Sequence, residues 1–166
     1  MGVLFDYFRA SSHDEARNLA LLPGGPLGSG PRLSTGADGM SAKGMDPVVV
    51  MGKLLALILD VEWSTRLVRP VDVWPAGPRP QRGDRVPDDS PWATGPWVSD
   101  LGTAFRDGFA DVDDFNLPWI ADKWWPFEEL PGVGDAMWAL NTAEEFVALA
   151  RRAQNSYQSL YCWACL

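Results

Sequence analysis

The chain has 166 residues, of which 46% are apolar and 22% charged, and its formal net charge is −8. No apolar run approaches the roughly 20 residues that a membrane-spanning helix needs. A phosphate backbone repels such an acidic surface, so direct binding of nucleic acid is not expected. Composition therefore favours a globular protein that binds neither a membrane nor nucleic acid.

The first half of the chain predicts a strand and two helices. Residues 3–9 are rich in aromatic side chains, which favour a strand. Ser12 is expected to cap a helix, because Glu15 three residues later completes a capping box. Residues 23–46 are rich in Gly, Pro and Ser and predict a loop. Asp46 and Pro47 then begin the clearest helix, whose apolar residues recur at helical spacing up to residue 59.

The second half predicts two more strands and three helices. Residues 67–74 resemble a strand, which Pro70 confines to a sheet edge because proline cannot donate to the ladder. The proline-rich residues 75–97 predict a long irregular loop. Ser99, Asn116 and Asn141 are favourable N-caps for three helices, and Pro126 should kink or end the second of them. Residues 160–166 form a final apolar strand.

These elements predict an α+β fold. Its small sheet contains the N- and C-terminal strands side by side, because neither apolar strand would be soluble alone, and it packs with four to five helices. No internal repeat or break in composition divides the chain. We therefore expect a single domain over residues 1–166, with a long Pro-rich loop at about 75–97.

Side chains that carry chemistry are scarce, with one histidine and two cysteines against nine tryptophans. Cys162 and Cys165 have the spacing of a redox or metal motif, but residues three apart in a strand point to opposite faces. We therefore expect structural thiols. With His13, these cysteines match no recurrent zinc pattern.

A calcium site is not expected either. Asp111, Asp113 and Asp114 recur like calcium ligands, but Asn116 stands where the loop requires glycine. The sequence therefore predicts no metal, no cofactor and no catalytic residue.

Charge and aromatic residues indicate a partner. Residues 100–166 carry a net charge of −7 and residues 1–99 only −1, so a basic protein would be attracted to the second part. In the aromatic cluster of Trp119, Trp124, Trp125 and Phe127, Trp124 falls on the apolar stripe and Trp125 about 100° away from it. Tryptophan is enriched at binding hot spots. The predicted partner-binding residues are Asp111, Asp113, Asp114, Asp122, Trp125, Glu128 and Glu129.

We therefore expect a non-enzymatic acidic binding protein, of the immunity type that neutralises a basic toxin or effector. The runner-up is a small-molecule-binding protein or hydrolase with a carboxylate-lined aromatic cleft, which would need two acids facing one cleft. A structural subunit of a larger assembly is a third possibility, and the oligomeric state stays open. The N-terminus shows no secretory signal, so a cytoplasmic location is expected.

Four segments resemble a family of uncharacterised small proteins of high-GC Gram-positive bacteria. They are residues 2–10 (GVLFDYFRA), 42–50 (AKGMDPVVV), 124–129 (WWPFEE) and 160–163 (LYCW), together 28 of the 166 residues. That family has no established activity. The resemblance implies a bacterial cytoplasmic domain and carries over no catalytic residue.

Overall fold

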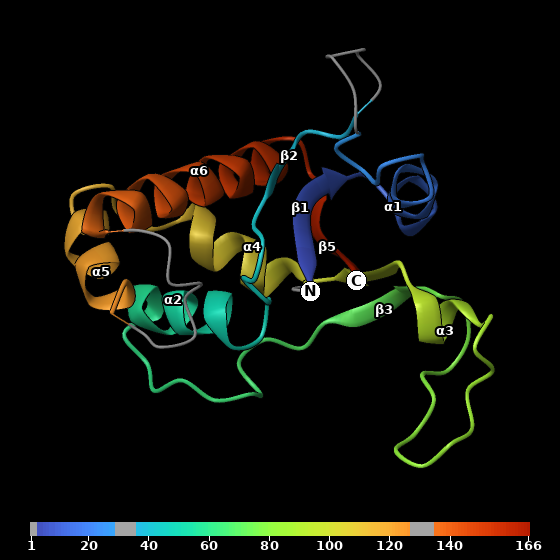
Figure 1. The fold of residues 1–166 in the computed structure, drawn as a ribbon. Coiled ribbons are helices and arrows are strands. Elements are labelled where there is room, and N and C mark those ends of the chain that lie inside the picture. Colours follow the sequence, from blue (N-terminus) through green and yellow to red (C-terminus); the bar gives the residue numbers. More distant parts are fainter. Residues whose placement is uncertain (1–2, 29–35, 127–134) are drawn as a thin grey trace.

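The computed structural model describes residues 3–28, 36–126 and 135–166. Its strands are β1 (Leu4–Ala10), β2 (Gly39–Ser41), β3 (Val71–Trp74), β4 (Trp97–Asp100) and β5 (Ser159–Cys165). Its helices are α1 (His13–Ala20), α2 (Val50–Leu59), α3 (Pro91–Thr94), α4 (Thr103–Ala110), α5 (Leu117–Trp124) and α6 (Ala136–Asn155). The strands form one antiparallel sheet in the order β2-β1-β5-β4-β3. Helices α2, α4, α5 and α6 gather on one side and α1 lies on the other (Figure 1).

The N- and C-terminal strands lie side by side, which confirms the predicted α+β fold. β1 and β5 pair along their whole length, from Leu4 opposite Cys165 to Ala10 opposite Ser159. The side chains of both strands contribute to two hydrophobic cores, one on each face of the sheet, because successive strand side chains point to opposite faces. Phe8 and Tyr161 stack beneath α1, with ring centroids 5.6 Å apart.

The larger core lies between the sheet and the four gathered helices. Phe146 of α6 contacts Phe109 of α4 and Tyr7 of β1, with ring centroids 4.6 and 5.0 Å away. The Tyr7 hydroxyl donates to the Met45 carbonyl at 2.7 Å, which satisfies the polar atom of this buried ring. None of the described helices is long and apolar enough to cross a membrane.

Several predicted boundaries are confirmed. The Ser12 hydroxyl accepts from the Glu15 N–H at 3.2 Å and caps α1. The Asp46 carboxylate accepts from the N–H groups of Val48 and Val49, at 2.9 and 2.7 Å, although the regular helix begins at Val50. Helix α5 ends at Trp124, two residues before Pro126. The strand predicted over residues 67–74 lies at the sheet edge, but β3 begins only at Val71, after Pro70.

The prediction that Ser99 begins a helix is wrong. Ser99 lies in β4, which pairs with β3 on one side and with β5 on the other, and α4 begins only at Thr103. β4 has only four residues, which are too few to show the alternation of side chains that identifies a strand. Pairing on both edges, which no local pattern reveals, makes this segment part of the sheet.

The start of the last helix is also corrected. α6 begins at Ala136 and is capped by Asp135, whose carboxylate accepts from the Trp138 N–H at 2.9 Å. The predicted cap, Asn141, therefore lies inside the helix. The residues that precede it are helix formers such as Ala, Met and Leu, so the helix extends back to the first strong cap.

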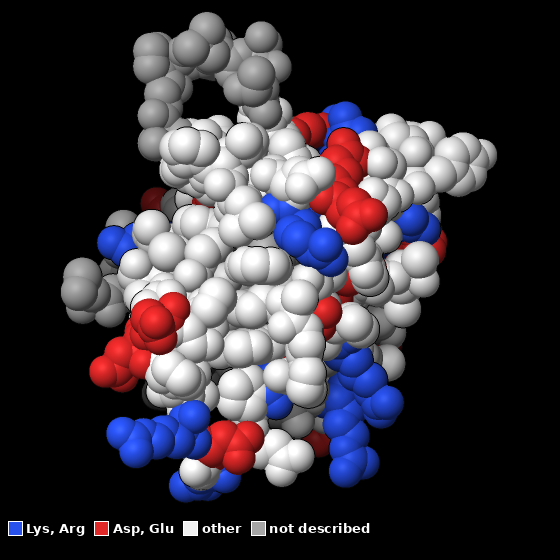
Figure 2. Space-filling model, turned by 90° about the vertical axis from the view of Figure 1, so that its right-hand side faces the viewer, with Lys and Arg blue, Asp and Glu red and all other residues white. Residues whose placement is uncertain are grey.

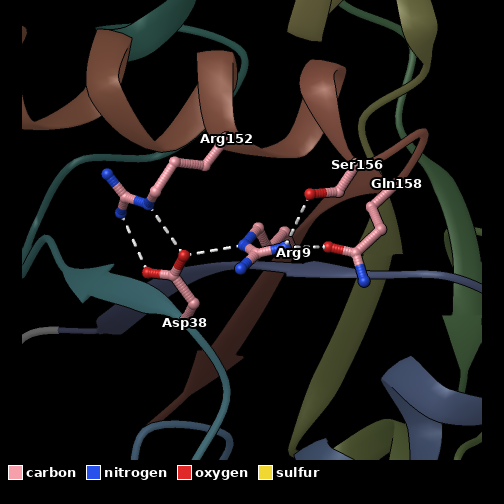
Figure 3. Close-up of polar contacts among 5 residues, drawn as sticks. All are labelled: Arg9, Asp38, Arg152, Ser156 and Gln158. Carbon is pink, nitrogen blue, oxygen red and sulfur yellow. Dashed lines mark hydrogen bonds and ion pairs between the residues drawn. The ribbon is translucent and has the colours of Figure 1, made fainter.

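One charged cluster joins the ends of three elements (Figure 3). Asp38, just before β2, accepts from Arg9 Nε of β1 at 2.6 Å and from Arg152 Nε and Nη2 of α6 at 2.8 and 2.9 Å. Arg9 also donates to Ser156 and Gln158 after α6. Hydrogen bonds from the two guanidinium groups, Arg152 first, lower the pKa of Asp38 to about 2.

Candidate functional site

Helix α5 is attached by one side and turns its other side outward. Trp124 is 0% exposed, and its indole N–H donates to the Val50 carbonyl of α2 at 3.1 Å. Leu117, Ile120 and Ala121 are buried on the same side of the helix. This firm attachment gives the outward residues fixed positions.

Three aromatic rings lie exposed on and beside this outward side. Phe115, in the turn before α5, is 88% exposed, Trp119 is 57% exposed and Trp125 is 41% exposed. Large rings in water are costly, so a cluster of them marks a candidate contact surface. We name the surface formed by Asp113, Asp114, Phe115, Trp119, Asp122 and Trp125 the α5 face.

The α5 face includes two aromatic residues that the sequence prediction left out. Trp125 was predicted off the buried stripe and is so, whereas Phe115 and Trp119 were not named as contact residues. For Trp119 the signal lies in the helical spacing, because it falls outside the stripe of Leu117, Ile120 and Trp124. Phe115 precedes the helix, so helical spacing gives no signal for it.

The predicted acids are brought together only in part. Asp111 accepts from Gln154 Nε2 at 3.0 Å, and Asp114 pairs with Arg151 Nη1 at 2.8 Å, so both are tied to α6. Asp113 accepts from the Phe115 N–H at 2.9 Å and shapes the turn that presents that ring. Asp122 is exposed on α5 itself, and Glu128 and Glu129 lie outside the described residues.

Arg151 of α6 holds the turn between α4 and α5 in place. Its guanidinium donates to the Ala110 carbonyl at 3.0 Å and to the Val112 carbonyl at 2.7 Å, in addition to its ion pair with Asp114. A planar guanidinium can serve several acceptors at once. The acidic turn is therefore a shaped element held against α6.

The Trp119 ring already holds a cation. The Lys123 ammonium lies 4.1 Å from the ring centroid, in the geometry of a cation–π contact. The pair is on the surface, where such a contact contributes about 0.5–1 kcal/mol. A cation from another molecule can therefore take the place of Lys123 at low cost.

The one histidine pairs with a carboxylate away from this face. His13 Nε2 lies 2.9 Å from Asp100 Oδ2, which joins the start of α1 to the end of β4. The neighbouring Tyr161 hydroxyl has its pKa raised to about 12, by burial first and by Asp100 second. This pair serves to hold α1 on the sheet.

The two cysteines are free and belong to opposite faces of the sheet. Cys162 packs in the larger core and Cys165 against the core beneath α1. Burial raises the pKa of the Cys162 thiol, which keeps it protonated and unreactive. Within the described residues, no three His, Cys, Asp or Glu side chains are grouped to hold a metal ion.

Comparison with known protein families, with curated proteins and with solved structures finds no match for this chain. The family resemblance of the four segments stays a prediction.

Proposed function

We propose that the protein is a non-enzymatic binding protein whose α5 face contacts a basic protein. The observation that carries the proposal is the exposure of Phe115, Trp119 and Trp125 on and beside one anchored helix, among carboxylates. The rings supply apolar contact area at small entropic cost, because each has only two side-chain torsions. The carboxylates supply the charge that attracts a cationic surface.

The carboxylates and the aromatic rings have different roles in binding. Asp113, Asp114 and Asp122 steer the partner, since opposite charge raises the rate of association at low salt. Trp119 then accepts a lysine or arginine of the partner on its ring face, in place of Lys123. Phe115 is the most exposed ring of the α5 face and inserts into an apolar hollow of the partner.

An immunity role in the cytoplasm is the specific form of this proposal. A basic toxin or effector is the class of partner that the charge of −7 in residues 100–166 favours. A binding protein of this class needs a shaped surface and no reactive group. The turn held by Arg151 and the helix anchored by Trp124 provide such a surface.

Affinity capture from a bacterial cytosol at low salt tests the proposal, with three immobilised proteins. They are the wild type, the variant Phe115→Ser/Trp119→Ser and the control Tyr157→Ser, which removes a ring that is 94% exposed elsewhere. We expect a basic protein to be retained by the wild type and the control, and lost from the double variant. Equal retention by all three proteins, or no retained basic protein at low salt, would refute the proposal.

A further inference from the structure

A hollow of about 490 Å³ opens over the sheet, between the start of α2 and strands β1, β5, β4 and β3. We name it the sheet pocket. Its walls are largely apolar and include Phe5 of β1, Val48 before α2, Ala164 of β5 and the ring of Trp97. Pockets of roughly 300–1,000 Å³ with apolar walls and a few converging polar groups are typical of sites for small molecules.

The floor of the sheet pocket is a polar row that crosses three strands. Asp72 of β3 lies opposite Ser99 of β4, and Ser99 lies opposite Cys162 of β5. Directly paired residues carry their side chains on the same face of a sheet, so a carboxylate, a hydroxyl and a thiol follow one another. The Ser99 hydroxyl oxygen lies 3.5 Å from Asp72 Oδ1. Hydrogen-bonding groups therefore converge at the bottom of an apolar hollow.

Arg79 enters the same pocket from the loop after β3. Its Nη2 donates to Asp72 Oδ1 at 2.6 Å, and its guanidinium lies 5.9 Å from the centroid of the Trp92 ring. A guanidinium has five N–H donors in a fixed planar arrangement. The bond to Asp72 uses part of this set, which leaves donors that a second acceptor in the pocket can use.

The aromatic wall is held in place by the loop itself. The Trp97 indole N–H donates to the Trp92 carbonyl at 3.3 Å. Gly95, whose φ is 74°, lies beneath the Trp97 ring, and a Cβ at this position would come within 3.2 Å of a ring carbon. The ring therefore rests against the backbone. A wall that is fixed before binding lowers the entropic cost of holding a ligand.

This side of the molecule is locally basic, although the chain is acidic. Residues 66–89 contain five arginines and four acids, whereas residues 100–166 contain four basic residues and eleven acids. Lys and Arg side chains gather along the lower edge of the face in Figure 2, at the level where Figure 1 places the loop after β3. Arg79 also lines two adjoining hollows together with Trp92 and Gln81. An anion is therefore the favoured charge type here.

We propose that the sheet pocket binds a small aromatic carboxylate. The planar ring lies against Trp97 and the apolar walls, and the carboxylate accepts hydrogen bonds from Arg79. Ser99 supplies a further polar contact at the floor. The site does not depend on the proposed function of the α5 face, because different elements form it.

The pocket is a binding site without the acid pair that glycoside hydrolysis requires. That chemistry needs two carboxylates flanking one bond. The sheet pocket is lined by one carboxylate, Asp72, and Arg79 is already bonded to it. The two converging acids that the runner-up hydrolase needs are not among the residues that line this pocket.

Three ligands with one ring system test the proposal: 2-naphthoate, 2-naphthamide and 2-naphthylmethylammonium. Their dissociation constants are measured by titration calorimetry at low salt. We expect 2-naphthoate to bind at least about tenfold more tightly than the ammonium compound, with the amide between them. Absence of saturable 2-naphthoate binding up to millimolar concentration, or tighter binding of the ammonium compound, would overturn the proposal.

Two matched variants separate a specific contact from general attraction. Arg79→Gln removes the proposed donor, whereas Arg85→Gln removes the same charge from the same loop without touching the walls of the sheet pocket. We expect Arg79→Gln to weaken 2-naphthoate binding about tenfold and Arg85→Gln less than about twofold, because a charge-assisted hydrogen bond depends on position. Equal weakening by both variants would contradict a site at Arg79.

Mapping by amide NMR guards against loss of structure in the variants. In the wild type, 2-naphthoate is expected to shift the resonances of Phe5, Val48 and Ser99. The double variant Asp72→Asn/Arg79→Gln keeps the pocket neutral and is expected to retain the wild-type spectrum elsewhere while losing these shifts. Shifts confined to other parts of the chain would place the ligand elsewhere and overturn the proposal.

Discussion

The α5 face and the sheet pocket both combine tryptophan with charged side chains, but they differ in the exposure of the rings and in the sign of the charge. On the α5 face, Trp119 and Trp125 project into solvent among carboxylates. Trp92 of α3 and Trp97 at the start of β4 are half-buried. The Trp97 indole donates to the Trp92 carbonyl, and the Arg79 guanidinium lies over the Trp92 ring. The difference follows from backbone context, because a helix anchored on one side must expose the other, whereas the Trp97 ring packs against the backbone that precedes it.

The comparison also separates the kinds of ligand that each region suits. An anchored helix with projecting rings and acids matches an extended basic surface, as in protein–protein contacts. A hollow with fixed apolar walls and one guanidinium matches a small anion. An acidic chain can therefore carry a local site of the opposite preference.

The largest expected effect concerns the anchor of the α5 face. Replacing Trp124 with alanine removes a fully buried ring and its bond to Val50, and should lower the free energy of unfolding by about 3–5 kcal/mol. Replacing its neighbour Trp125, which is partly exposed, should cost about 1 kcal/mol or less. Urea unfolding measures both variants. Similar losses would show that α5 is not attached through Trp124.

The next effect concerns the acidic turn. Arg151→Ala leaves the Ala110 and Val112 carbonyls without their donor, and should cost about 2 kcal/mol of unfolding free energy. Arg151→Lys keeps the charge but loses the planar group, so it should recover only part of this loss. Full recovery by lysine in urea unfolding would mean that charge alone holds the turn.

A smaller, pH-dependent effect is expected at Asp38, which belongs to neither region. Its pKa falls from the ordinary 3.8 to about 2 in the folded protein. The ionised carboxylate therefore contributes stability above pH 4, and this contribution is lost as the pH falls from about 4 to about 2. Because the side chain is 33% exposed and solvent screens it, we expect about 1 kcal/mol. The unfolding free energies of wild type and Asp38→Asn should differ at pH 6 and converge near pH 2, and a constant difference would refute this.

The smallest expected effect concerns the exposed rings themselves. Phe115→Ser should change the free energy of unfolding by less than about 0.5 kcal/mol, because its side chain lies mainly in solvent. Trp119→Ser also loses the contact with Lys123 and should cost about 0.5–1 kcal/mol. Thermal unfolding monitored by circular dichroism measures this. A loss of several degrees in Tm would mean that the rings stabilise the fold and are not reserved for a partner.

The parts of the fold that local patterns encode could be predicted from the sequence. The terminal strands follow from aromatic and apolar composition, the Ser12 cap from capping chemistry, and the end of α5 from Pro126. β4 could not be predicted, because its pairing with β3 and β5 depends on residues far away in the chain. The start of α6 was missed because Asn141 is also an acceptable cap.

The α5 face and the sheet pocket also differ in how far the sequence predicts them. Exposure of Trp125 could be predicted from one helix, since a helical wheel needs no tertiary information. The sheet pocket could not, because Asp72, Arg79 and Ser99 come together only through strand register and the path of a loop. Local periodicity in the sequence carries no information about strand register or about the path of a loop.

One NMR experiment tests the separation of the two regions directly. The nine indole N–H resonances are followed while deca-lysine and then 2-naphthoate are added to the protein. We predict that deca-lysine shifts Trp119 and Trp125 and that 2-naphthoate shifts Trp97 and Trp92. Movement of one common set of resonances by both ligands, or movement of the opposite set by each, would contradict the account.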